Sequence, residues 1–119
     1  MTAPHDMPSA AALVEAVREF LERDVMSATS GRVQFHTRVA INVLGMVERE
    51  LALGAGQAER HAAGLARLGF SSDAELAAAI RSGKLDERMG EVFRFVHDTV
   101  HDKLEVANPR YVGIAPRSP

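Results

Sequence analysis

Residues 32–53, RVQFHTRVAINVLGMVERELAL, form the most apolar stretch of the chain and decide how the rest of it can fold. At about 100° per residue, an α-helix over this stretch gathers its larger apolar side chains on one broad face. That face consists of Phe35, Val39, Val43 and Met46, and it is extended by Ala40, Leu44, Val47 and Leu51. Apolar residues around so much of the circumference indicate a central helix with several neighbours. We expect Gly54 and Gly56 to end it.

Helical periodicity continues on both sides of this stretch. A first helix is predicted from near Pro8, because proline favours a first turn, and the segment 27–31 ends it. Its apolar stripe consists of Leu13, Val14, Val17, Leu21 and Val25. A weaker third helix is predicted over 57–68, where Gly64 costs about 1 kcal/mol relative to alanine.

Two further helices are predicted in the C-terminal half. Ser72 and Glu75 form a capping box that opens a short helix, which Gly83 closes. The last helix runs from near Asp86 to Ala107, and Pro109 ends it. Its stripe consists of Phe93, Val96, Val100 and Leu104. Three long and two short helices with short turns predict an all-α antiparallel bundle. We expect one domain over residues 1–119, with flexible ends at about 1–7 and 115–119.

The composition excludes several functional classes. The 119 residues carry a net charge of −2, so no basic excess suggests nucleic acid. Cysteine is absent, which rules out disulfides, thiolate nucleophiles and cysteine-ligated zinc. The N-terminus has no secretory signal pattern and no stretch is long and apolar enough to cross a bilayer, so we expect a cytoplasmic protein without membrane contacts. Twelve arginines against two lysines, with abundant alanine, suggest a bacterial source.

The segment HDTVHDK, residues 97–103, is the first candidate for chemistry. His97 and His101 lie one helical turn apart on one face and could present two imidazoles to one metal ion. A zinc centre needs a third ligand, which His36, Glu50 or His61 could supply only if the fold brought it near. The alternative, which we favour, is that both histidines flank the apolar stripe of a packed helix.

Arg38, Asn42 and Arg49 form the second candidate, a polar strip along the central helix. Guanidinium groups suit an anion or phosphate site. We favour the alternative that they pair with carboxylates of neighbouring helices, because an unpaired buried charge is costly. The candidate partners are Asp98, Asp102, Glu15 and Glu22. His36 is expected at the edge of the core, bonded to a backbone carbonyl. No nucleophile motif, phosphate loop or dinucleotide fingerprint is present, so we expect neither catalytic residues nor a cofactor, and favour a non-enzymatic role.

Three segments together resemble a small, uncharacterised bacterial all-helical family, a domain of unknown function. They are GRVQFHTRVAINVLGMVERE at 31–50, AIRSGKLD at 79–86 and VHDTVHDKLEVANPRYV at 96–112, and the resemblance extends from about Pro8 to Val112. It implies a companion of aminoglycoside-phosphotransferase-like kinases and acyl-CoA dehydrogenases, and it assigns no catalytic residue. His97 is not part of its motif. The matching positions are Phe35, His36, Asn42, Lys103, Leu104, Asn108, Pro109, Arg110 and Tyr111.

The ANPRY segment has a physical interpretation of its own. Asn108 suits a helix end, and Pro109 enforces the stop. Arg110 and Tyr111 then leave at a fixed angle, and the tyrosine ring can anchor the tail in a groove while its hydroxyl bonds a polar group. The segment could be structural or a docking surface.

Two functions remain in competition. The first, which we favour, is a non-catalytic interaction module that pairs with itself as a homodimer or with a kinase-like or acyl-CoA-handling enzyme, and it predicts an exposed apolar patch on the second or last helix. The second is a small-ligand or metal-binding bundle. Its ligand-binding residues would be His36, Arg38, Asn42, Asn108, Arg110 and Tyr111, and its metal ligands would be His97 and His101.

Overall fold

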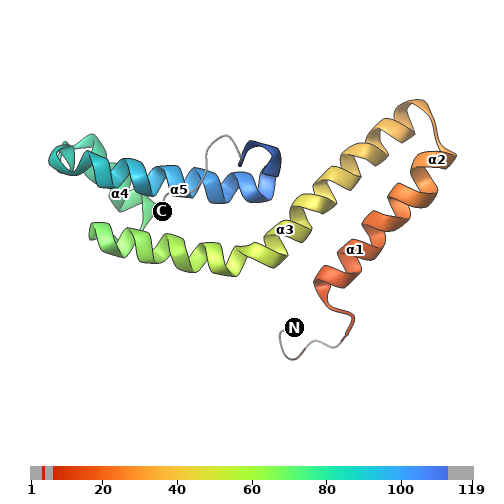
Figure 1. The fold of residues 1–119 in the computed structure, drawn as a ribbon, viewed down its shortest axis with the longest axis horizontal. Coiled ribbons are helices and arrows are strands. Elements are labelled where there is room, and N and C mark those ends of the chain that lie inside the picture. The colour runs from red at the N-terminus through yellow and green to blue at the C-terminus, as the bar shows by residue number, and fades with distance from the viewer. Residues whose placement is uncertain (1–3, 5–6, 113–119) are drawn as a thin grey trace. The chain divides into compact units, whose positions relative to one another are not determined.

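The structure is a computed structural model and describes residues 4 and 7–112 (Figure 1). Its α-helices are α1 (Ala10–Phe20), α2 (Met26–Ala28), α3 (Gly31–Leu68), α4 (Asp73–Arg81) and α5 (Met89–Ala107). A π-helical turn, η1 (Leu21–Val25), links α1 to α2, and two 3₁₀ turns, η2 (Asp86–Arg88) and η3 (Pro109–Tyr111), flank α5. The described residues contain no strand, so the all-α prediction is confirmed; the bundle arrangement stays a prediction.

The chain divides into two compact units, Met1–Leu53 and Gly54–Pro119, and helix α3 contributes to both. The first unit holds α1, η1, α2 and α3 up to residue 53. The second holds the rest of α3 together with α4, α5 and η3. The single domain stays a prediction, and the predicted flexible ends fall almost entirely outside the described residues.

The first unit is a helical hairpin, in which α1 lies antiparallel to the first part of α3 (Figure 1). Ser9 begins α1 by accepting a hydrogen bond from the N–H of Ala12 at 3.1 Å. At the other end, the Gln34 side chain donates to the carbonyls of Met26 and Thr29, both at 3.1 Å. The side chain therefore satisfies carbonyl groups that the end of the helix leaves without intrahelical partners.

Helix α3 corrects the sequence prediction at Gly54 and Gly56. The chain stays helical through both and ends only at Leu68, so the two helices predicted over 32–53 and 57–68 are one helix of 38 residues. A glycine commonly ends a helix by adopting a positive φ. Among the described glycines, a positive φ occurs at Gly31, where α3 begins, and at Gly69 and Gly83, and not at Gly54 or Gly56. Alanine-rich sequence after residue 54 favours continued helix and outweighs the cost of two glycines.

The second unit surrounds a small apolar core, made of Leu65, Leu68, Leu76, Ala79, Leu85 and Val92. Local signals place its helices as predicted. Gly69 ends α3 in a Schellman motif, with the Phe70 N–H bonded to the Leu65 carbonyl at 2.9 Å. Ser72 caps α4 by accepting from the Glu75 N–H at 3.2 Å. The Glu75 carboxylate differs from the predicted capping box, because it accepts from Ser71 and not from Ser72.

Gly64 allows close contact between α3 and α5. A Cβ at this position would lie 2.7 Å from two ring carbons of Phe95, which is closer than packed atoms can come. The glycine that weakened the helix prediction is therefore the point where the aromatic ring of α5 meets the backbone of α3.

The apolar stripes do not all lie where the sequence predicts. Phe35, Val39, Val43 and Met46, predicted to face several neighbours, are between 38% and 58% exposed. On α5, Phe93, Val96 and Val100 are exposed too, while Val92 beside them is buried. The core of the second unit uses the adjacent face of α5, so the predicted inward stripe of that helix was wrong.

Candidate functional site

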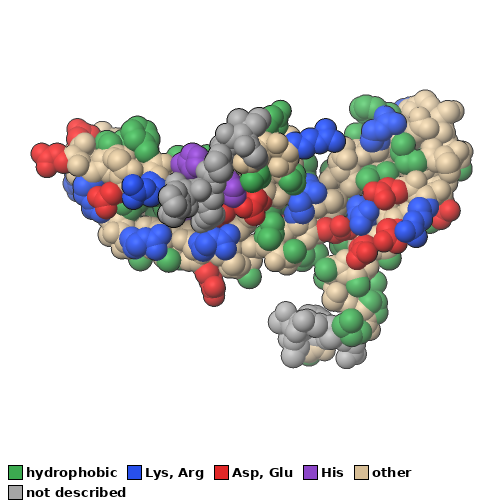
Figure 2. All heavy atoms as spheres, in the orientation of Figure 1, with side chains coloured by type: hydrophobic (Ala, Val, Ile, Leu, Met, Phe, Trp, Pro, Cys, Tyr) green, Lys and Arg blue, Asp and Glu red, His purple; other side chains and the backbone are tan. Residues whose placement is uncertain are grey.

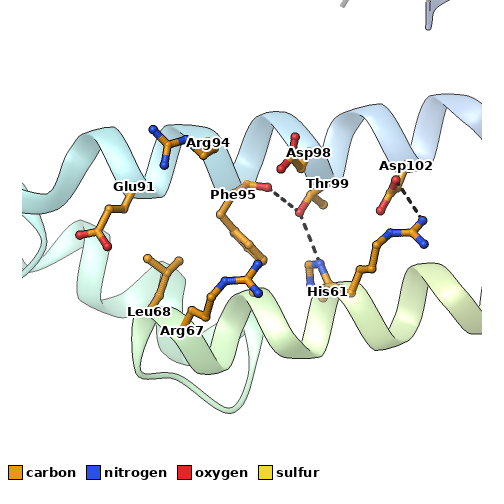
Figure 3. Close-up of a pocket in the computed structure, with 11 residues that line it drawn as sticks. His61, Arg67, Leu68, Glu91, Arg94, Phe95, Asp98, Thr99 and Asp102 are labelled. Carbon is orange, nitrogen blue, oxygen red and sulfur yellow. Dashed lines mark hydrogen bonds and ion pairs between the residues drawn. The ribbon is translucent and has the colours of Figure 1, made fainter. Parts of the chain in front are cut away.

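A groove between α3 and α5 is the main concave feature that the second unit presents (Figure 3). It encloses about 230 Å³. Its lining is Arg60, His61, Gly64, Arg67, Leu68, Glu91, Arg94, Phe95, Asp98, Thr99 and Asp102. Guanidinium and carboxylate groups alternate along it, so it carries no strong excess of either charge.

His61 has partners on two other helices. Its Nε2 lies 2.7 Å from Asp73 Oδ1 at the start of α4, and its Nδ1 lies 3.4 Å from Thr99 Oγ1 on α5 (Figure 3). Thr99 donates its hydroxyl proton to the Phe95 carbonyl at 2.9 Å. His61 thus contacts residues of α4 and α5 from α3, and we interpret this Thr–His–Asp arrangement as a structural link between three helices.

Asp102 connects α5 to α3 near the other end of the groove. Its Oδ1 lies 3.5 Å from Nη2 of Arg60, and its carbonyl accepts from Gln57 Nε2 at 2.9 Å. The carboxylate is largely buried and the guanidinium is half-exposed, so the pair lies partly shielded from water. These contacts hold the C-terminal half of α5 against α3.

His101 is the one buried imidazole among the described residues, at 6% exposure. Its Nδ1 lies 3.1 Å from Glu105 Oε1 and 3.8 Å from Asp102 Oδ1, without an aligned hydrogen bond. Ligand atoms of these three residues lie within 4.8 Å of one another. One nitrogen and two carboxylate oxygens at that separation could hold a divalent cation.

His97 is not part of this cluster. Its ring is exposed and its Nδ1 lies 3.6 Å from Asp98 Oδ1, the carboxylate next to it in the chain. Within the part of the chain that the structure describes, the residues grouped as possible ion ligands are His101, Asp102 and Glu105. A joint role of His97 and His101 at a metal stays a prediction, and so does the alternative that both histidines flank the apolar stripe of a packed helix.

The predicted polar strip lies on one side of the hairpin in the first unit. His36, Arg38 and Asn42 are exposed, and Arg49 is half-buried. His36 packs edge-on against the ring of Phe35, with centroids 5.4 Å apart. Its expected place at a core edge was wrong, because no core forms beneath this part of α3. Ligand binding by His36, Arg38 and Asn42 stays a prediction.

The ANPRY segment ends α5 as expected. The Asn108 N–H donates to the Leu104 carbonyl at 2.8 Å, and Pro109 begins the 3₁₀ turn η3. The Tyr111 N–H donates to the Asn108 carbonyl at 3.1 Å. Arg110 and Tyr111 are both exposed, so the tyrosine ring is not sunk in a groove. Their binding roles stay predictions.

Electrostatics at the rim of the groove are local. Arg88 donates from Nε to Glu91 Oε2 at 2.8 Å, and this hydrogen bond holds the pKa of Glu91 below its ordinary value. Nη1 of Arg88 also donates to the Leu68 carbonyl at 3.2 Å, which satisfies a group at the end of α3. The arginine therefore links the end of α3 to the first turn of α5.

Sequence reasoning did not identify Arg18 as the main polar tie of the hairpin. Its Nε donates to Glu48 Oε1 at 2.7 Å, and its Nη1 donates to Glu22 Oε1 at 3.0 Å. These bonds raise the pKa of the guanidinium. Arg18 and Glu48 are 30 residues apart, so no local spacing could signal the pair. The sequence signal that could have indicated this contact is the position of the apolar stripe around each helix, because it shows which sides of α1 and α3 can face each other.

Within the described residues, none of the helices combines the length and apolar character needed to traverse a bilayer. No curated protein and no solved structure matches the chain. Residues 27–111 match the sequence profile of a family described as a domain of unknown function, DUF6285. That match covers most of the 119 residues, and the chain therefore belongs to the DUF6285 family.

Proposed function

We propose that the protein is a non-catalytic interaction module whose hairpin is completed by another protein chain. The observation that carries this proposal is the burial pattern of the first unit. Its described part contributes no residue to the buried apolar core, and its one buried side chain is Thr37. Among its exposed large apolar residues, three of α1 and four of α3 recur at helical spacing: Leu13, Val17, Phe20, Phe35, Val39, Val43 and Met46. We call these seven residues the hairpin face.

The α1 and α3 parts of the hairpin face meet at Val17 and Val43. Arg18 and Glu48 are hydrogen-bonded across the hairpin, which fixes the sides of α1 and α3 that face each other. In two antiparallel helices, the residue one position before each contacting residue points to the same side of the pair. Val17 precedes Arg18 on α1, and Val43 precedes the half-buried Leu44 on α3. Val17 and Val43 therefore lie on the same side of the hairpin, and the rest of each stripe continues from them around the outer side of its helix.

The opposite side of the hairpin is polar. It takes the positions that follow the contacting residues, namely Glu15, Glu19 and Glu22 on α1 and Arg38, Asn42 and Arg49 on α3. The polar strip predicted from the sequence therefore shares a side with acidic residues of α1, which favours a structural role for it over an anion site. A hairpin with one polar and one apolar side resembles half of a bundle.

Covering the hairpin face would contribute substantially to stability. Full burial of a large apolar side chain stabilises a protein by about 1.5–3 kcal/mol. Covering each of the seven half-exposed side chains would therefore add stabilisation on the order of 1 kcal/mol. That total is comparable to the net stability of a whole small domain, roughly 5–15 kcal/mol. Exposed contiguous apolar surface of this kind marks protein interaction sites.

The family resemblance suggests the binding partner of this module: a small-molecule kinase of the aminoglycoside-phosphotransferase type or an acyl-CoA dehydrogenase. The test is calorimetric titration of the full chain against both purified enzymes from the same genome. We expect one of them to bind with a negative heat-capacity change, the signature of apolar burial. Val43→Glu in the hairpin and Val96→Glu on α5 should separate the two exposed surfaces. The absence of binding to either enzyme would contradict the accessory role.

A cation site at His101, Asp102 and Glu105 is the second candidate function. The favouring observation is the buried Nδ1 of His101, which lies near two carboxylates without an aligned hydrogen bond. Titration with Zn²⁺ or Mn²⁺ tests it. Saturable binding at one site, lost in Glu105→Gln and retained in His97→Gln, would support it; identical heats for wild type and Glu105→Gln would rule it out.

A further inference from the structure

We propose that the chain covering the hairpin face is a second copy of this protein, so that two hairpins pair through their apolar sides into a four-helix assembly. This inference rests on the proposed function and adds the identity of the partner. It leaves the exposed apolar residues of α5, Phe93, Val96 and Val100, for the companion enzyme.

The exposed area of the hairpin face suits the centre of a dimer interface. Its seven side chains are between 38% and 58% exposed. A standard interface buries about 800 Å² on each partner, contributed by about 20–30 residues with an apolar centre and a polar rim. The hairpin face supplies such an apolar centre.

The charge distribution favours a like partner. The hairpin from residue 10 to residue 53 carries six acidic and five basic side chains, a net charge of −1. On the face drawn in Figure 2, acidic and basic side chains of the hairpin lie among one another, with no field of one sign. Self-association therefore meets little electrostatic repulsion.

The hairpin face itself contains no charged residue. In a twofold dimer the same patch meets its own copy, so the patch must be complementary to itself. An apolar patch meets that condition, because aliphatic and aromatic groups pack against their like. The polar side is not self-complementary in this way. In a twofold dimer through that side, Glu15, Glu19 and Glu22 would face their own copies unless each lay opposite an arginine of the partner.

Pairing two hairpins is also a common solution to this burial problem. Antiparallel helix pairs with short connections form four-helix bundles when their apolar sides meet. Each hairpin then gives two helices to one core. Residues near the middle of the face, Val39 and Val43, would lie close to the symmetry axis.

Sedimentation equilibrium of the full chain tests the inference first. The wild type should sediment at about twice 12.9 kDa, and Val43→Glu should weaken dimerisation about a hundredfold or more, because it places a charge in the interface on each partner. Ala52→Glu is the matched control: it adds the same charge at an exposed position of α3 nine residues after Val43, which lies on the opposite side of the helix. It should sediment as the wild type does.

Cysteine cross-linking keeps the test valid if Val43→Glu does not fold. The chain has no cysteine, so Val43→Cys and Ala52→Cys each create a single thiol. Under mild oxidation, Val43→Cys should form a covalent dimer and Ala52→Cys should remain a monomer.

The outcomes separate this inference from the proposed function. A wild-type monomer that binds a companion enzyme through Val43 overturns the second copy and leaves the interaction module standing. If the wild type is a monomer, and the thiol of monomeric Val43→Cys resists alkylation without any partner, both are overturned, because the chain would then cover its own hairpin face.

Discussion

The two units of this protein are built from similar amphipathic helices but differ in what covers their apolar sides. In the second unit, α3, α4 and α5 enclose six buried hydrophobic residues. In the described part of the first unit, the buried side chain is Thr37, and the seven apolar residues of the hairpin face are exposed together with others such as Leu51. The difference teaches that the periodicity of a helix shows which side is apolar, whereas burial depends on how many helices the chain supplies. A third helix completes the second unit, and the hairpin has none of its own.

The largest effect is expected from a core truncation in the second unit. Leu76 on α4 is 4% exposed, and Leu76→Ala should lower the free energy of unfolding by about 2–5 kcal/mol through lost burial and a cavity. Urea denaturation measures it. The loss should not depend on protein concentration. Leu51→Ala, an exposed position of the hairpin, is the control and should cost much less in the monomer.

Gly64 offers the next test of the second unit. Gly64→Ala should destabilise it by about 1–3 kcal/mol, because the new methyl group overlaps the Phe95 ring. Gly56→Ala in the same helix is the matched control. Its methyl group would lie 3.4 Å from an Arg60 nitrogen, so it should stabilise the helix by up to about 1 kcal/mol. Equal thermal shifts for the two variants would refute the close approach of α5.

The polar tie of the hairpin should contribute less. Glu48→Gln replaces a charge-assisted hydrogen bond to Arg18, which is partly shielded, and should cost about 1 kcal/mol. Glu22→Gln removes the exposed partner of the same arginine and should cost about 0.3–0.5 kcal/mol. Chemical denaturation of both variants checks the order. If Glu22→Gln costs more, the bond across the hairpin does not hold α1 in place.

The smallest effect concerns the start of α4. Hydrogen bonds from the Ser71 N–H and hydroxyl lower the pKa of Glu75 below its ordinary value of 4.5. A carboxyl group whose pKa is lower in the folded state stabilises the fold above its unfolded pKa, and this contribution disappears as the pH falls through the folded pKa. We therefore expect a small loss of stability below about pH 4.5, absent in Glu75→Gln. Carboxyl NMR titration measures the pKa directly, and a value at or above 4.5 would contradict the contact.

Local signals in the sequence predicted the helix ends well. Ser72, Gly83 and Pro109 act through hydrogen bonds and φ angles within a few residues, and the structure confirms each of them. Gly54 and Gly56 show the limit of this reasoning. Glycine permits a helix end without requiring one, and the alanine-rich sequence that follows keeps the chain helical.

Contacts between distant residues could not be predicted from one sequence. The approach of Phe95 to Gly64 and the bond of Arg18 to Glu48 both depend on which helix sides meet. The same limit affected the candidate site. The spacing of His97 and His101 placed two imidazoles on one helix, but the structure surrounds His101 with Asp102 and Glu105 and leaves His97 exposed.

Amide hydrogen exchange at two protein concentrations tests the central claim most directly, since it measures both units in one experiment. If another copy completes the hairpin, raising the concentration about a hundredfold should slow exchange in α1 and in residues 31–53 of α3, because dimerisation stabilises by mass action. Exchange in α4 and in residues 89–100 of α5 should not change. Equally strong protection of the hairpin at both concentrations in a monomeric sample would contradict the account, because the hairpin would then be stable without a second chain.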